Sequence, residues 1–77
     1  MGTIYNNTKE IPNYLKQPNG CYRGNYNGKI VMSFIEDDIT MKIQIRSLRV
    51  SNDSTWTNLN NGFSEKEVLI NEITYFN

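Results

Sequence analysis

The sequence predicts a mostly β domain, a small antiparallel sheet or half-barrel of four to five strands, with an α+β fold as the alternative. Residues 21–50 contain two turn signals and alternating apolar residues, so they should form two hairpins that share one strand. The chain has 77 residues, which is the size of one small domain. We therefore expect a single domain, 1–77, in which an irregular N-terminal segment, 1–20, packs on the sheet.

The N-terminal segment is polar and contains prolines, so only short elements are expected there. Residues 3–5 fit a short edge strand, and Thr8 is a residue type that caps the first turn of a helix. Ile11, Tyr14 and Leu15 would then form a small apolar stripe that covers one end of the sheet.

The first hairpin is predicted from the pair Asn27-Gly28. Both central positions of a two-residue hairpin turn need positive φ, which Asn and Gly tolerate. The flanking strands are 21–26 and 29–36. The opposed pairs are then Tyr22 with Ser33, Gly24 with Val31, and Tyr26 with Lys29. This register places both tyrosines on the same face as Val31.

The second hairpin is predicted from the pair Asp37-Asp38, interpreted as the two central residues of its turn. Strand 29–36 then pairs with a third strand, 39–50. The opposed pairs are Phe34 with Met41, Met32 with Ile43, and Ile30 with Ile45. These six apolar residues share one face, so we expect them to form the core, with the two tyrosines on the opposite face.

The third strand changes its apolar pattern near its end. Its apolar residues alternate up to Ile45 and then shift parity to Leu48 and Val50. This shift predicts a β-bulge or a bend near Arg46 and Ser47.

The C-terminal third contains one further strand and one ambiguous segment. Residues 55–59 have a strand-like composition, with Trp56 as the expected core anchor. Residues 64–76 fit a helix, because Ser64 and Glu67 match a capping box. They also fit a strand, because β-branched and aromatic residues are frequent in them. Both alternatives stay open for this segment.

The composition argues against an enzyme and against a metal or cofactor site. The chain has no histidine, the commonest general base and metal ligand, and Cys21 has no partner for a dyad or a disulfide. Eight basic and eight acidic residues cancel, which makes nucleic acid a less favoured partner. No apolar run is long enough for a signal peptide or a membrane span, so a cytoplasmic location is expected.

One face of the predicted sheet is the candidate binding surface. Tyrosine is enriched at protein interfaces, and the predicted registers place tyrosines beside basic residues, with Lys29 opposite Arg46. Three consecutive acids at the second turn would add an acidic tip. The predicted partner-binding residues are Tyr22, Tyr26, Lys29, Val31, Glu36, Asp37, Asp38 and Arg46.

These features predict a small non-enzymatic protein-binding module. Its small size, and its many Asn and Ile residues, which AT-rich codons encode, favour an accessory protein of a phage or mobile element. Such a protein would inhibit a host factor in the host cytoplasm, for example a CRISPR or other defence effector. The first alternative is a nucleic-acid- or nucleotide-binding small β-barrel-like protein, in which tyrosines edged by Arg and Lys stack on bases. The second is a self-assembling structural protein, such as a homodimer paired through strand edges.

Overall fold

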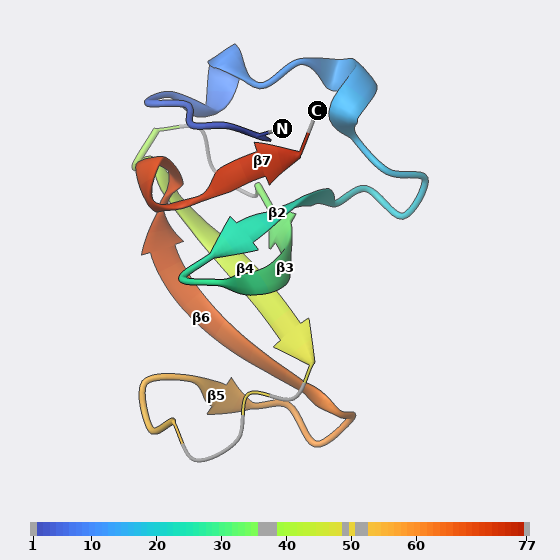
Figure 1. The fold of residues 1–77 in the computed structure, drawn as a ribbon, viewed down its shortest axis with the longest axis vertical. Helices are drawn as coiled ribbons and strands as arrows, with labels where there is room; N and C mark the ends of the chain where they lie inside the picture. The colour runs from blue at the N-terminus through green and yellow to red at the C-terminus, as the bar shows by residue number, and fades with distance from the viewer. Residues whose placement is uncertain (1, 36–38, 49, 51–52, 77) are drawn as a thin grey trace.

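Every strand that the structure describes belongs to one antiparallel sheet. The computed structural model describes residues 2–35, 39–48, 50 and 53–76 (Figure 1). The strand order is β1-β7-β2-β3-β4-β6-β5. The strands are β1 Gly2–Thr3, β2 Tyr22–Tyr26, β3 Lys29–Phe34, β4 Lys42–Leu48, β5 Thr57–Asn58, β6 Phe63–Leu69 and β7 Thr74–Phe76. Three short 3-10 helices lie between them, η1 Thr8–Glu10, η2 Asn13–Leu15 and η3 Ile70–Glu72.

The mostly β class is therefore confirmed. The helical elements within the described residues are single 3-10 turns, so the α+β alternative does not hold for them. The sheet has seven strands in this part of the chain, more than the four to five predicted. The difference comes from segment 64–76, which the sequence left open between helix and strand and which forms most of β6 and all of β7.

The first hairpin has the predicted register. Tyr22 pairs with Ser33 and Tyr26 pairs with Lys29. The two turn residues both have positive φ, 50° at Asn27 and 82° at Gly28, as a two-residue hairpin turn requires. The strong turn signal was therefore sufficient to align β2 with β3.

The predicted register of the second hairpin is wrong. Met32 pairs with Arg46 rather than with Ile43, a displacement of three residues. An odd displacement exchanges the faces of one strand relative to the other, because side chains alternate. The observed register centres the β3–β4 connection on residue 39, so it is longer than a two-residue turn. Lys29 consequently does not oppose Arg46, and the proposed turn pair Asp37-Asp38 lies outside the described residues.

The inner face of the sheet carries the core, and the two tyrosines of β2 belong to it. Tyr22 and Tyr26 are only 8% and 6% exposed. Tyr22 contacts Tyr75 edge-on, with ring centroids 6.2 Å apart, and Tyr26 contacts Trp56 in the same way at 6.1 Å. The other buried apolar residues include Val31, Ile43, Ile45, Val68, Ile70 and Ile73. The predicted role of Trp56 as a core anchor is therefore confirmed.

The N-terminal segment lies along the end of the sheet formed by β1, β7 and β2 (Figure 1). Ile11 and Leu15 are buried and join the core, as predicted. Tyr14 does not, because the tight 3-10 turn η2 points it outward and leaves it 79% exposed. The N-terminal edge strand covers Gly2–Thr3 rather than residues 3–5, and it pairs with β7.

The C-terminal half resolves the remaining alternatives in favour of strands. β4 pairs with β6 without interruption from Lys42 to Leu48, so the bulge predicted near Arg46 and Ser47 is absent. The capping box predicted at Ser64 does not form, because Ser64 lies in β6 and its hydroxyl donates to the carbonyl of Val50. Segment 64–76 is therefore strand β6, the 3-10 turn η3 and strand β7.

Gly24 is required where β2 pairs with the start of β7. A Cβ atom at this position would lie 2.6 Å from the carbonyl oxygen of Thr74 and 2.8 Å from Ile73 Cγ2. We expect Gly24→Ala to lower the free energy of unfolding by about 2 kcal/mol, because backbone must move to make room. Urea unfolding measures this, with Arg23→Ala, an exposed position in the same strand, as the control. Equal stability of the two variants would contradict the packing described here.

Candidate interaction surface

The outer face of the sheet is the surface that the observed register leaves without a cover. The side chains of β2, β3, β4 and β6 that do not enter the core project from it. One row across these strands consists of Arg23, Met32, Arg46 and Glu65. The neighbouring row includes Ile30, which the sequence placed in the core, and the opposed pair Leu48 and Phe63.

A hollow of about 570 Å³ lies on this outer face, and we call it the groove. Its apolar lining is formed by Ile30, Met32, Leu48 and Phe63. Ile30 and Leu48 are 59% and 55% exposed, although both are aliphatic residues within strands of the sheet. Contiguous apolar groups left in water cost free energy, and in monomeric proteins such patches mark interaction sites.

Two basic side chains of the outer face, Arg23 and Arg46, flank the apolar lining. Lys29 borders the groove, although its pairing with Tyr26 directs its side chain toward the inner face. No acidic residue lines the groove within the described part of the chain. Arg46 is held in place, because its Nε donates to a Glu65 carboxylate oxygen at 2.8 Å and its guanidinium lies 4.8 Å from the centre of the Phe34 ring. These two contacts fix the direction of the Arg46 side chain and offset part of its charge.

Lys29 also lies close enough to an acidic residue to affect it. The pKa of Asp53 is lowered, mainly because the Thr55 hydroxyl donates to its carboxylate at 2.6 Å and the Thr55 amide donates at 3.0 Å. The positive charges of Lys66 and Lys29 lower it further. Of the three basic residues around the groove, Arg23 is therefore the one whose charge has no counterpart among the described acids.

The predicted site residues are divided between the two faces. Arg46 lies at the groove on the outer face, whereas Lys29 and Val31 border the groove with side chains that point to the inner face. Tyr22 and Tyr26 point to the opposite face and are buried there, so the exposed tyrosine face does not exist. The acidic tip Glu36, Asp37 and Asp38 lies outside the described residues.

The residues that sequence reasoning missed are Arg23 and the four apolar residues of the groove. A signal for them was present in β2, where Arg23 and Asn25 alternate with Tyr22 and Tyr26. Charged and amide side chains favour solvent, so this alternation points the tyrosines inward. The first hairpin then requires Ile30 and Met32 to face outward.

The described residues contain no group of three His, Cys, Asp or Glu residues that could hold a metal ion. Cys21 is buried, and its Sγ lies 3.0 Å from the amide oxygen of Asn19, a contact that suits a packing role. None of the helical turns in the described ranges is long and apolar enough to cross a membrane.

Comparison with known proteins identifies no relative. No protein-family model matches the chain, no curated protein matches it, and no solved structure matches it. Function is therefore inferred from the chemistry of the outer face.

Proposed function

We propose that this chain is a small non-enzymatic protein-binding module that holds its partner on the outer face of the sheet. The observation that carries the proposal is the groove, in which exposed Ile30 and Leu48 lie beside Arg23 and Arg46. Arginine, methionine and aromatic residues are enriched in protein interfaces, and an apolar centre with a polar rim is their usual arrangement. That the partner is a host factor inhibited by a mobile-element protein, in the cytoplasm, stays a prediction from the sequence.

The two alternative functions receive less support from the same surface. Stacking on nucleic-acid bases depended on Tyr22 and Tyr26, whose rings are buried against Tyr75 and Trp56. Self-assembly was expected through the strand edges of 21–26 or 55–59, but β2 lies between β7 and β3, and the edge strand β5 has two residues.

The proposal is tested by removing the apolar contacts of the groove. In the double variant Ile30→Thr with Leu48→Thr, both residues keep a side chain that suits a strand but lose their apolar surface. We expect a partner captured by the wild-type chain, and then purified, to bind this variant at least about tenfold more weakly in calorimetry.

Ile39→Thr is the matched control, because Ile39 is 83% exposed and does not line the groove. It should bind the partner with unchanged affinity. Binding of the double variant at wild-type strength would overturn the proposed surface. Light scattering on the same proteins adds a second check, because a wild-type dimer that the double variant dissociates would show that a second copy occupies the groove.

A further inference from the structure

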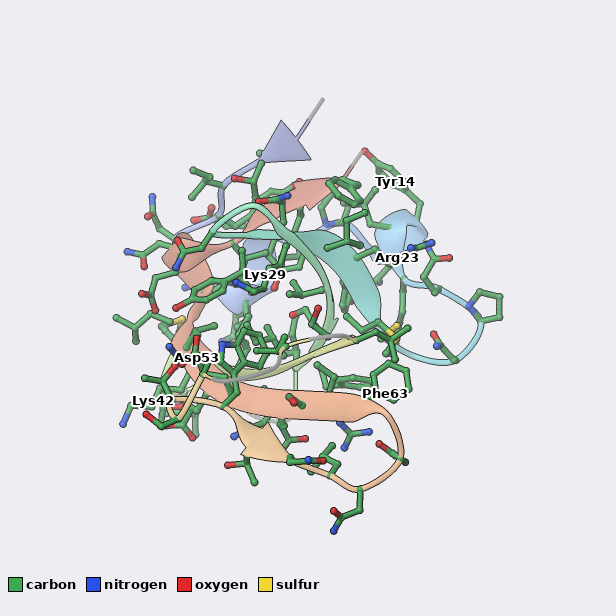
Figure 2. The ribbon with its side chains drawn as sticks, turned by 60° about the horizontal axis from the view of Figure 1, so that its bottom comes forward. Tyr14, Arg23, Lys29, Lys42, Asp53 and Phe63 are labelled. Carbon is green, nitrogen blue, oxygen red and sulfur yellow. The ribbon has the colours of Figure 1, made fainter. Side chains whose placement is uncertain are left out.

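Arg23 lies between two hollows of the outer face. It lines the groove, and it also lines a second hollow of about 400 Å³ together with Tyr14, Leu15, Gln17 and Phe76. We call this second hollow the aromatic hollow. Figure 2 shows Arg23 between Tyr14 on one side and Phe63, at the far end of the groove, on the other. One guanidinium therefore separates two hollows that each contain exposed apolar or aromatic side chains.

The charge of Arg23 is available to a ligand. Its side chain is exposed, and within the described residues it has no ion-pair partner, whereas Arg46 is paired with Glu65. A guanidinium offers parallel N–H donors that match the two oxygens of a carboxylate, and a pair flanked by apolar surface is screened less by water. Arg23 is thus suited to bind a carboxylate between two apolar contacts.

The spacing of the strands sets the length of the ligand. The aromatic hollow includes Phe76 of β7, and the groove extends to Phe63 of β6, with β2, β3 and β4 between them. Four steps between neighbouring strands of about 4.8 Å cover roughly 19 Å, which an extended peptide spans with about six residues.

We infer that the partner presents an extended acidic segment across the strands, with an Asp or Glu at Arg23 and apolar side chains in the groove and the aromatic hollow. This inference rests on the proposed function and names the chemistry of the partner. A nucleic acid fits less well, because its phosphates need a track of cations, whereas this chain has zero net charge and Arg46 is already paired.

The test uses a displayed library of random peptides of about nine residues, long enough to span both hollows. The library is selected on the wild-type chain, on Arg23→Glu and on the matched charge reversal Lys16→Glu. Lys16 is exposed and lines neither hollow. Selected peptides are synthesised, and their affinities are measured by fluorescence anisotropy.

We expect the wild-type selection to enrich Asp or Glu with apolar residues on both sides. Arg23→Glu should bind these peptides at least about tenfold more weakly and should itself select Lys or Arg at that position. Lys16→Glu should stay within about twofold of wild type. Together these results would support the acidic segment as the partner.

Three results would overturn the inference, and they differ in what they say about the proposed function. Peptides that lack acids, or that bind Arg23→Glu equally well, exclude the acidic segment but keep the outer face as a binding site if Ile30→Thr with Leu48→Thr abolishes their binding. If a labelled oligothymidine binds more tightly than any peptide, and its binding depends on Arg23, the ligand of Arg23 is a phosphate rather than a carboxylate. The absence of any selected peptide overturns the inference alone, because a folded partner could still bind the outer face, and the Ile30→Thr with Leu48→Thr variant decides that question.

Discussion

Replacing Ile45 with alanine should lower the free energy of unfolding by about 3 kcal/mol, whereas Ile30→Ala should change it by less than about 1 kcal/mol. Ile45 is 0% exposed in the core, and truncation would leave a cavity there. Ile30 is 59% exposed on the outer face, where truncation removes little buried surface. The pair is informative because the sequence-based register placed these two residues opposite each other on one buried face.

Urea unfolding of the two variants and the wild type measures this difference directly. Ile43→Ala serves as a second core variant, because Ile43 is 2% exposed in the same strand as Ile45. A large loss of stability in Ile30→Ala, comparable with that in Ile45→Ala, would favour the sequence-based register over the observed one. These unfolding measurements therefore distinguish the inner face from the outer face without a binding partner.

The sequence was sufficient for those parts of the fold that a local signal specifies. The Asn27-Gly28 turn aligned β2 with β3, because its backbone requirement admits few alternatives. The prediction of which face of β4 is buried was also correct. Lys42 and Arg46 alternate with Ile43 and Ile45, and only the isoleucines belong in the core.

The face of strand β3 that enters the core could not be predicted from its own residues. From Ile30 to Phe34 the strand has no charged residue, and both of its faces contain apolar side chains. The turn that should have aligned it with β4 was interpreted as two residues, and the observed connection is longer. Only the polar alternation of the neighbouring strand β2 could have chosen the correct face, which is why the groove was missed while Arg46 was found.

Tyr75→Phe should lower the free energy of unfolding by about 1–3 kcal/mol at neutral pH, because it leaves a buried hydroxyl without a partner. The Tyr75 and Ser33 hydroxyls are 2.7 Å apart, and both residues are 0% exposed. Ser33→Ala should be destabilising for the same reason. The double variant should lose less free energy of unfolding than the sum of the two single losses, because neither hydroxyl is then left unpaired. Additive losses in this double-mutant cycle would contradict a hydrogen bond between the two groups.

Tyr75 should also make the fold sensitive to alkali. Burial raises the pKa of Tyr75 to about 12; the hydrogen bond to Ser33 lowers it and nearby Tyr22 raises it further. In the unfolded chain a tyrosine loses its proton near pH 10, so between about pH 10 and 12 the unfolded state binds fewer protons than the folded state. The raised pKa of Tyr75 therefore contributes fully to the free energy of unfolding below pH 10. This contribution, up to about 3 kcal/mol, is lost as the pH rises toward 12.

The comparison of wild type with Tyr75→Phe isolates this contribution, because the other tyrosines are common to both proteins. Urea unfolding between about pH 9 and 11.5 should show the wild-type stability falling more steeply, so that the difference between the two proteins narrows as the pH rises. Parallel curves would mean that Tyr75 ionises equally easily in the folded and unfolded states. Such a result would be incompatible with a tyrosine hydroxyl buried in the core.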